Sequence, residues 1–475
     1  MISSTRREPV NPPVKPGDIV ELAITDLNHE GEGVARVGGF AIFIPGALPG
    51  ELARVKVETV KKNYGRGLAL DILSPSPDRL SPACGVFQRC GGCQLQHLSY
   101  TRQLEFKRER VVEALERIGR LAGIKVEPTI GMEEPWRYRN KAQYPVGLRQ
   151  GGPGKAGLIG GFFEKGTHVI VPCENCLIHH PLAGRVLNET LRLAETFGLD
   201  AYDEKTGSGF LRHVLVKIGF ATGETMVVLV VNGRSFPRGR EFGEALHQAV
   251  PQIQSVIQNI NQERTNVILG SHSRVLWGKD HIIDMLGHFR FRISAESFYQ
   301  VNPAQTETLY RKAVEFAGLS GREVVADLYC GIGTITLLLA EEAREVYGIE
   351  VVPAAISDAR ANARMNQITN ARFMEGDTAA VLSRLMRDQG IRFDVVVMDP
   401  PKSGCEGRVL DLLIAARVER IVYVSCNPAS LARDLARLAG GGYSVEHVQP
   451  VDMFPQTYHV ETVALLRVGD NAARR

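Results

Sequence analysis

Cys426 lies two residues after an apolar stretch of the sequence and two residues before a proline. The run Ile421–Val424 predicts a buried strand, and Pro428 is typical of the first turn of a helix. A thiol between the end of a strand and the start of a helix can have a lowered pKa and act as a nucleophile. A buried, inert thiol is the commoner role of a single cysteine. We favour the nucleophile because Asp399 is predicted at the same edge of the sheet.

Asp399 and Glu461 are candidate carboxylates for this site. Asp399 follows the predicted strand Val395–Met398 and precedes Pro400 and Pro401, which stop the strand and hold the carboxylate at the edge of the sheet. Glu461 lies in a predicted final strand near the C-terminus and is the candidate for a base. A surface glutamate in a β-hairpin is the alternative, and the local pattern by itself favours that alternative.

A glycine-rich turn follows the predicted buried strand Val324–Leu328. Gly331 and Gly333 would let the backbone approach a ligand closely at the carboxyl end of the strand. The next predicted strand ends in Glu350, where a carboxylate can accept hydrogen bonds from ribose hydroxyls. The pattern predicts a nucleoside-containing cofactor, and a simple packing turn is the alternative.

Two classes of cofactor fit such a turn. A dinucleotide site requires a third glycine where Thr336 stands, and a pyrophosphate at the helix N-terminus. An acid before the turn, Asp327, suits S-adenosylmethionine, which carries a sulfonium and an ammonium group and no phosphate. The sequence therefore favours S-adenosylmethionine. Asp377, after the predicted strand Phe373–Gly376, is either an acid near the adenine or a helix cap.

The elements that must position these residues can be predicted from the spacing of apolar side chains. About five short strands between residues 17 and 73, separated by Gly- and Pro-containing turns, are typical of a small OB-like barrel. Residues 101–121 have helical spacing, and strands and helices mix between 140 and 300. From about residue 300, apolar strands alternate with helices, which predicts a parallel, doubly wound sheet.

The composition excludes several classes of protein. The chain has 475 residues, of which 44% are hydrophobic and 23% charged, so it is neither a disordered chain nor a coiled coil nor collagen-like. No uncharged apolar run reaches the roughly 18 residues of a membrane helix. Met1–Val10 contains no apolar run of a secretory signal, so we expect a cytoplasmic protein without a membrane contact. Eight cysteines in such a chain favour thiols, metal or catalysis over disulfides.

The distribution of charge is more informative than its sum. The formal net charge is only +3, but residues 79–165 carry 15 Lys and Arg against 8 Asp and Glu. A concentrated positive patch is what a polyanion would bind, and a solvated surface is the equally weighted alternative. Within this segment, Trp136–Lys141 interleaves aromatic side chains with cations, as nucleic-acid-binding surfaces do. A strand with exposed ends is the alternative for that stretch.

Five cysteines have the spacing of metal ligands. Cys84, Cys90 and Cys93 lie close together, and Cys173 and Cys176 follow about 80 residues later. Two CxxC pairs could form a tetrahedral zinc site. Three cysteines of the first group and one of the second could instead hold an iron–sulfur cluster. The separation of the two groups is far beyond the usual spacing of zinc ribbons.

These motifs together resemble the S-adenosylmethionine-dependent RNA uracil-5-methyltransferases. The N-terminal stretches Gly31–Ala35 and Pro45–Glu51 are similar to a TRAM domain, an RNA-binding barrel. The resemblance thus covers nearly the whole chain. The stretches that match the methyltransferases in family order are Phe298–Pro303, Asp327–Gly333, Gly348–Glu350, Asp399–Pro401, Ser425–Pro428 and Phe454–Glu461.

The resemblance implies a role for each site residue. Cys426 would add to C6 of the uracil so that C5 can attack the methyl group, and Glu461 would then remove the C5 proton. Lys402 stands where the family often has Arg, which puts a bidentate contact there in doubt. The implied cofactor contacts are Gln300, Tyr329, Glu350 and Asp399, with Thr334 and Asp377 as further contacts.

The resemblance also favours a [4Fe–4S] cluster over zinc. The ligands it implies are Cys84, Cys90, Cys93 and Cys176, and Cys173 would be spare. A structural rather than a redox role is expected, because the methyl transfer needs no electron. The TRAM domain and the cluster together look more like the ribosomal RNA branch, which predicts 23S rRNA as the RNA partner. A tRNA enzyme with the same chemistry and a non-catalytic RNA-binding protein are the alternatives.

The predicted architecture has three parts. An OB-like TRAM barrel spans 11–75, and a mixed α+β central domain with the cluster comprises 76–95 and 128–298. An α/β catalytic domain, Rossmann-like as in class I methyltransferases, comprises 96–127 and 299–475. We expect no obligate protein partner.

Overall fold

The computed structural model describes residues 12–149 and 157–469. Residues 1–10, in which the sequence analysis predicts no secretory signal, lie outside these ranges, as do the first residue of the predicted barrel and the last six residues of the chain. The chain divides into two compact units. The first unit comprises Met1–Phe87, Cys93–Phe106 and Gln456–Tyr458, and the second comprises the remaining residues.

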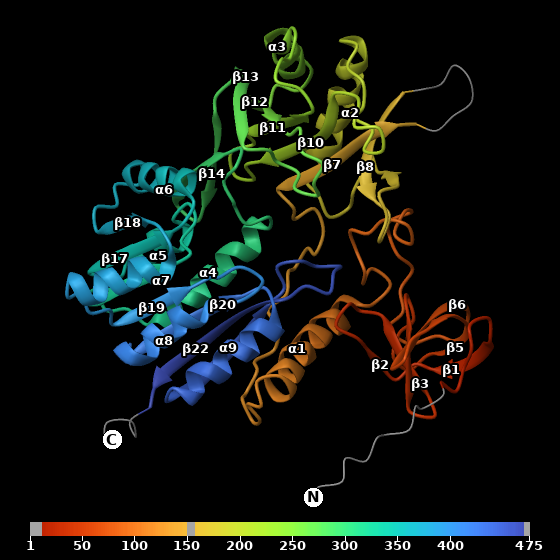
Figure 1. Cartoon of the computed structure of the whole chain (residues 1–475), viewed down its shortest axis with the longest axis horizontal. Helices are drawn as coiled ribbons and strands as arrows, with labels where there is room; N and C mark the ends of the chain where they lie inside the picture. The colour runs from red at the N-terminus through yellow and green to blue at the C-terminus, as the bar shows by residue number, and fades with distance from the viewer. Residues whose placement is uncertain (1–11, 150–156, 470–475) are drawn as a thin grey trace, which may run out of the picture. The chain divides into compact units, whose positions relative to one another are not determined.

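The first unit is built on one six-stranded sheet, drawn in red and orange in Figure 1. Its order is β1-β5-β6-β4-β3-β2, and the neighbours are antiparallel except for β4 and β6. Alternating apolar residues, such as Ile42 and Ile44 on β4 and Val55 and Val57 on β5, are fully buried inside the barrel. The predicted barrel is therefore confirmed. The strands are β1 (Ile19–Ala23), β2 (Asp26–Leu27), β3 (Gly33–Val37), β4 (Phe40–Ile44), β5 (Leu52–Val60) and β6 (Tyr64–Ser74).

The second unit contains a mixed sheet of seven strands in the order β13-β12-β11-β10-β7-β8-β9. Strands β10 and β11 are buried on both faces, because α2 and α3 pack on one face and apolar side chains of β14 and β15 pack on the other. This burial explains the nearly unbroken apolar sequence of β11. A separate hairpin, β14 (His281–Leu286) and β15 (Phe289–Ser294), follows. The other elements are β7 (Lys141–Leu148), β8 (Leu158–Phe163), β9 (Ile170–Pro172), α2 (Pro181–Thr196), β10 (Leu211–Ile218), β11 (Thr225–Val231), α3 (Gly239–Ala249), β12 (Ile253–Ile260) and β13 (His272–Gly278).

The last part of the second unit is a seven-stranded sheet in the order β18-β17-β16-β19-β20-β22-β21. The first five strands are parallel, as expected for a doubly wound sheet. The fold class is therefore confirmed. Only β22 runs against the other strands, because no crossover helix separates it from β21, whereas β21 follows α9 and runs in the same direction as β20. The strands are β16 (Val324–Leu328), β17 (Glu345–Glu350), β18 (Ala371–Glu375), β19 (Val395–Met398), β20 (Arg420–Ser425), β21 (Tyr443–Val451) and β22 (Glu461–Val468).

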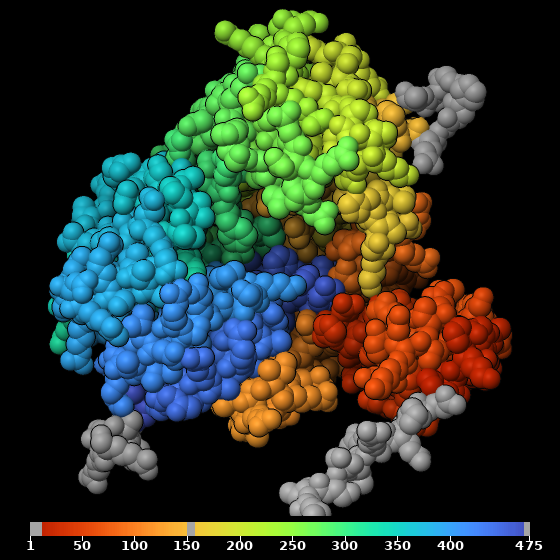
Figure 2. All heavy atoms as spheres, viewed as in Figure 1, coloured from red at the N-terminus to blue at the C-terminus, as the bar shows by residue number. Residues whose placement is uncertain are grey.

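Helices cover both faces of this sheet (Figure 1). On one face lie α4 (Pro303–Ala317), α5 (Thr334–Ala340) and α6 (Pro353–Met365). On the other lie α7 (Thr378–Ser383), α8 (Gly407–Ala416), α9 (Pro428–Gly440) and the C-terminal part of α1 (Tyr100–Arg117). In the space-filling view, the blue segment that contains α8 and α9 presents a continuous surface of atoms (Figure 2). A short π-helix, Arg384–Asp388, extends α7.

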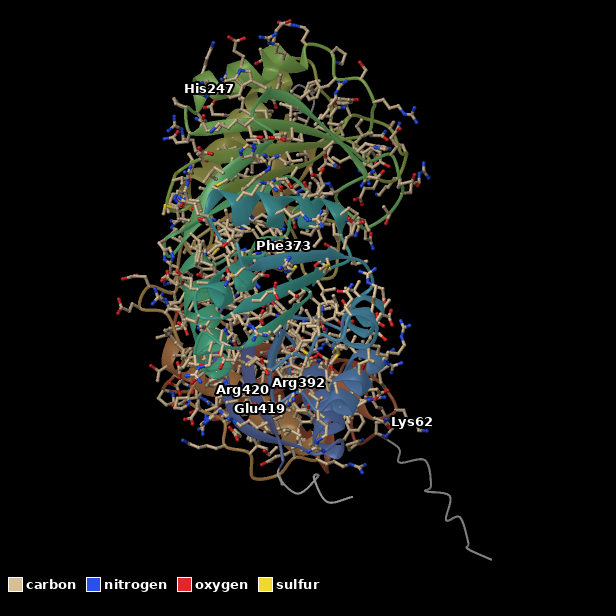
Figure 3. The ribbon with its side chains drawn as sticks, turned by 90° about the vertical axis from the view of Figure 1, so that its left-hand side faces the viewer. Lys62, His247, Phe373, Arg392, Glu419 and Arg420 are labelled. Atoms are coloured by element: carbon tan, nitrogen blue, oxygen red, sulfur yellow. The ribbon has the colours of Figure 1, made fainter. Side chains whose placement is uncertain are left out.

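Different groups of residues lie at the amino ends and at the carboxyl ends of these strands. Arg392, Glu419 and Arg420, labelled in Figure 3, lie at the amino ends of β19 and β20. The predicted site residues lie at the carboxyl ends of the strands. Within the described ranges, no helix is long and apolar enough to cross a lipid bilayer.

Candidate functional site

Cys426 and Glu461 lie at the adjoining ends of two neighbouring strands. In the antiparallel ladder of β20 and β22, Ser425 is paired with Thr462. Cys426 is the next residue after Ser425, and Glu461 is the residue before Thr462, so each lies one residue beyond the last pair of the ladder. Glu461 is buried and Cys426 is half-buried. The fold therefore brings a thiol and a carboxyl group from distant parts of the chain to one place.

The electrostatic environment of Cys426 differs from the expectation of an activated thiol. Burial raises the pKa of Cys426 to about 11, and the charges of Glu461 and Asp399 add to this effect. Lys402 acts in the opposite direction and lowers the pKa of the thiol. The predicted lowering of this pKa is therefore wrong for the protein without its ligands, because burial and, to a lesser extent, two carboxyl groups disfavour the thiolate.

Asp399 lies at the end of β19, beside the strand that leads to Cys426. Burial raises the pKa of Asp399 to about 6. Burial and the nearby Asp399 also hold the pKa of Glu461 well above its ordinary value. The loop that follows Asp399 is fixed to α9, because the Lys402 carbonyl accepts hydrogen bonds from Asn427 Nδ2 (3.0 Å) and Ser430 Oγ (3.2 Å).

The glycine-rich turn between β16 and α5 has the geometry of a ligand-binding loop. Tyr329, Gly331 and Gly333 all have positive φ angles, of 67°, 55° and 85°. On the neighbouring strand, a Cβ atom at Gly348 would lie 2.9 Å from a ring carbon of Phe373, which is labelled in Figure 3. The backbone conformation favours glycine at 331 and 333, and close packing against Phe373 requires it at 348. The approach of this turn to a ligand stays a prediction.

Acidic side chains surround this turn. Glu350 accepts hydrogen bonds from the backbone N–H groups of Gly331 (3.2 Å), Val351 (2.8 Å) and Val352 (2.9 Å), which fixes its carboxylate. Asp327 is fully buried and accepts a hydrogen bond from Thr336 Oγ1 at 2.5 Å. Burial raises the pKa of Asp327 to about 7 despite that hydrogen bond, and the Asp399 and Glu350 charges contribute.

This acidic edge fits a cationic cofactor. Asp327, Glu350 and Asp399 lie at the carboxyl ends of three adjacent strands, β16, β17 and β19. A bound sulfonium or ammonium group would lower the cost of holding several carboxylates together. A pyrophosphate would increase that cost. This set of three carboxyl groups therefore fits S-adenosylmethionine and disfavours a dinucleotide.

Gln300 and Thr334 are brought together by a residue that the sequence analysis did not single out. Burial raises the pKa of the Tyr310 hydroxyl, and the nearby side chains of Thr334 and Gln300 act in the opposite direction. The Gln300 carbonyl accepts a hydrogen bond from Asn140 Nδ2 at 2.9 Å. Tyr310 lies on an amphipathic helix, where its spacing is that of an ordinary core residue, so no local signal distinguishes it.

Tyr329 and Asp377 have different surroundings. The Tyr329 hydroxyl lies 3.5 Å from Cys405 Sγ, in the loop after β19. Asp377 is the N-cap of α7, where its Oδ1 accepts a hydrogen bond from the Ala380 N–H at 2.9 Å. The capping alternative is therefore observed for Asp377, and its contact with the cofactor stays a prediction.

The predicted cluster ligands are divided between the two units. Cys84 and Cys93 belong to the first unit, and Cys90 and Cys176 belong to the second. Cys90 Sγ accepts a hydrogen bond from the Gly92 N–H at 3.4 Å, and Cys176 Sγ lies 3.1 Å from His179 Nδ1.

All eight cysteines lie in the described part of the chain, and the structure pairs none of them in a disulfide. Among residues 12–149 and 157–469, no group of three or more His, Cys, Asp or Glu side chains is arranged to hold a metal ion. The thiol donors suit an iron–sulfur cluster chemically, and the cluster stays a prediction.

Comparison with known protein families gives two matches. Residues 208–468 match the model of the tRNA (uracil-5-)-methyltransferases, and residues 13–70 match the TRAM domain. The first match covers all the methyltransferase motifs identified in the sequence. The second covers most of the six-stranded sheet of the first unit.

Related proteins extend the likeness to almost the full length of the chain. A protein described as an uncharacterized RNA methyltransferase of Halalkalibacterium halodurans is 51% identical over 96% of this chain and 98% of its own length. A protein with the same description from Caldanaerobacter subterraneus is 48% identical over 95% of this chain and 99% of its own length.

A solved structure is similar over the same extent. The tRNA (uracil-54, C5)-methyltransferase of Pyrococcus abyssi, determined with S-adenosyl-L-homocysteine, has a TM-score of 0.73 and 28% identity. The likeness covers 94% of this chain and 100% of that one. The chain therefore belongs to the tRNA (uracil-5-)-methyltransferase family, and is an S-adenosylmethionine-dependent enzyme that methylates C5 of uracil in RNA.

Proposed function

We propose that this enzyme methylates C5 of a uridine in 23S rRNA through a covalent adduct between Cys426 and C6 of the base. The observation that carries the mechanism is the placement of Cys426 and Glu461 at adjoining ends of β20 and β22. A uracil between them would have a nucleophile at C6 and a carboxylate available for the proton at C5. Cys426 and Glu461 are therefore the proposed catalytic residues.

The proposed reaction follows from this pair. The Cys426 thiol loses its proton to solvent, and the thiolate forms a bond to C6, which makes C5 an enolate-like carbon. When bound, S-adenosylmethionine supplies the electrophilic methyl group that C5 takes up. The Glu461 carboxylate then accepts the C5 proton. The electrons of the C5–H bond restore the C5–C6 double bond as the bond from sulfur to C6 breaks, and the thiolate is released.

The cofactor contacts are proposed on the positions described above. Glu350 would accept hydrogen bonds from the ribose, because its carboxylate is already fixed by three backbone N–H groups. Asp399 would lie near the positive charges and contact the uracil. Gln300, Tyr329 and Thr334 complete the proposed set, and Asp377 would be a peripheral contact.

The choice of 23S rRNA depends on the sequence, since the TRAM domain together with the cysteine motif is more typical of ribosomal RNA enzymes. A tRNA substrate is the second candidate. It is favoured by the full-length likeness to the Pyrococcus abyssi enzyme, whose substrate is named as uracil 54 of tRNA. We also propose the [4Fe–4S] cluster on Cys84, Cys90, Cys93 and Cys176, the three-part division of the chain, and action on RNA in the cytoplasm.

One experiment separates the two substrates. The purified enzyme is incubated with methyl-labelled cofactor and either 23S rRNA or tRNA, each made by transcription so that it carries no modification. We expect label in 23S rRNA, at a uridine that can then be mapped by mass spectrometry of nuclease fragments. Label confined to tRNA would favour the second candidate. Activity that survives in Cys426→Ala would contradict the mechanism for either substrate.

A further inference from the structure

The segment from β21 to β22 begins opposite the proposed base. Val451, the last residue of β21, is paired with Glu461, the first residue of β22. Asp452 follows Val451 directly. The turn formed by Asp452–Pro455, which we name the 452 turn, therefore starts one residue from the backbone partner of Glu461. A change in the position of this turn would change the position of the Glu461 carboxyl group.

A fully buried ion pair lies in the 452 turn. Lys107 of α1 donates a hydrogen bond from Nζ to Asp452 Oδ1, and neither side chain is exposed to solvent. The same Nζ donates to the Phe454 carbonyl at 3.1 Å. Asp452 Oδ1 also accepts a hydrogen bond from the Phe454 N–H at 3.2 Å. Lys107 and Asp452 therefore fix both the start and the middle of the turn.

Every carbonyl group of the 452 turn accepts a hydrogen bond from a buried side chain outside it. The distances are 3.0 Å at Asp452, 3.0 Å at Met453, 3.1 Å at Phe454 and 2.9 Å at Pro455. Four consecutive carbonyls held by side chains are far more than a connecting loop requires. The donors, in the same order, are Gln305, Asn302, Lys107 and Tyr138.

The charged pair is the costly part of this arrangement. Two buried charges must give up their hydration, and a well-packed apolar pair can often stabilise a fold equally well. A buried ion pair is thus better explained by the exact geometry that it imposes than by stability. Asn302 and Gln305 lie at the start of α4, just after Gln300, so the same contacts link the 452 turn to the proposed cofactor site.

We infer that Lys107 and Asp452 are positioning residues that hold the 452 turn and thereby aim the Glu461 carboxyl group at the C5 proton of the Cys426 adduct. This inference depends on the proposed function. The inference goes beyond the proposed function, because it assigns a catalytic consequence to two side chains that are remote from the reacting atoms. Misplacement of Glu461 should slow the breakdown of the adduct more than its formation.

The test uses the full-length enzyme in single turnovers with methyl-labelled cofactor and substrate RNA. Samples are quenched in detergent, and label bound to protein is compared with label in released RNA. The informative variant is Lys107→Met with Asp452→Asn, which removes both charges and keeps an acceptor for the Phe454 N–H. We expect adduct breakdown to slow about tenfold or more, with the KM for RNA and the affinity for S-adenosylhomocysteine within about twofold of wild type.

The control variant is Glu51→Gln in the first unit, which disrupts another buried carboxylate pair, with Arg79. It should lower stability without changing the ratio of adduct to product. A folded double variant with wild-type breakdown would overturn the inference alone, whereas a wild-type enzyme that forms no adduct would overturn the proposed mechanism as well. If the double variant does not fold, Asp452→Asn alone decides the question by the same ratio.

Discussion

The carboxyl group of Asp399 lies close enough to that of Glu461 to help raise its pKa, and both raise the pKa of the Cys426 thiol. Three groups that lose protons therefore oppose one another's ionisation at one edge of the sheet. Lys402 partly offsets this effect at the thiol. The site is suited to hold a cation, and its chemistry should depend strongly on pH.

Alkylation of Cys426 without cofactor should be slow at pH 7 and should still rise near pH 9.5. The thiolate fraction increases about tenfold per pH unit below the pKa of about 11. In Glu461→Gln, loss of the carboxylate charge lowers that pKa, so alkylation at pH 8–9 should be several-fold faster. Site-resolved mass spectrometry measures the rate, with Glu446→Gln on the exposed part of β21 as the control. A plateau below pH 8 would show that the thiol is already activated.

RNA containing 5-fluorouridine should form a stable adduct with the enzyme, because fluorine at C5 cannot leave as a proton. The adduct should appear as a slower band in a denaturing gel and should be absent in Cys426→Ala. Undiminished trapping in that variant would refute the assignment of the nucleophile.

Glu461→Gln should let the adduct accumulate on ordinary RNA, because the C5 proton has no acceptor. The rate of product release should fall about 100-fold or more, as is typical for loss of a general base. Single-turnover kinetics provide the measurement. Rapid release in this variant would show that another group removes the proton.

Asp327→Asn should stabilise the enzyme at alkaline pH. The pKa of Asp327 is raised to about 7 in the folded state, against 3.8 ordinarily. The stability associated with the neutral carboxyl is therefore complete below pH 4 and is lost as the pH rises through 7. At pH 8 the variant should gain on the order of 4 kcal/mol over wild type, and the difference should vanish near pH 4.

Thermal unfolding across this pH range, without cofactor, measures the effect. Asp411→Asn at an exposed ion pair of α8 is the matched control and should show no such pH dependence. An Asp327→Asn difference that does not change with pH would mean that the pKa of Asp327 is the same in the folded and the unfolded chain.

Anaerobically purified enzyme should be brown and absorb near 400 nm if the cysteines hold the proposed cluster. Cys176→Ser should lose iron and colour, whereas Cys173→Ser, three residues away, should keep both. Iron and sulfide analysis quantifies the comparison. A colourless protein with stoichiometric zinc would show that the cysteines hold zinc instead of the cluster. Loss of colour in Cys173→Ser alone would show that Cys173, and not Cys176, is the fourth ligand.

The parallel part of the catalytic sheet could be predicted from the sequence, because β16, β19 and β20 are runs of buried valine and isoleucine at α/β spacing. The antiparallel direction of β22 could not, since a fully buried strand has the same apolar pattern in either direction. For the same reason, the sequence of the strand that contains Glu461 did not predict that this strand pairs with β20, the strand that leads to Cys426.

The residues of the site that were missed share one property. Tyr310 and Lys107 lie on amphipathic helices, and their partners are remote in sequence, so their spacing is that of ordinary core and surface positions. The raised pKa of Cys426 was missed because the sequence places a helix start beside the thiol but gives neither the burial of the thiol nor its distances to the carboxyl groups.

The order of strands at the end of the sheet has a consequence for folding. β22 follows β21 in the chain but lies between β20 and β21. β21 therefore cannot join the sheet until β22 has inserted, and this insertion is also what brings Glu461 beside Cys426. Catalytic competence therefore requires this insertion, because a sheet that lacks β22 would contain the cysteine but not the base beside it.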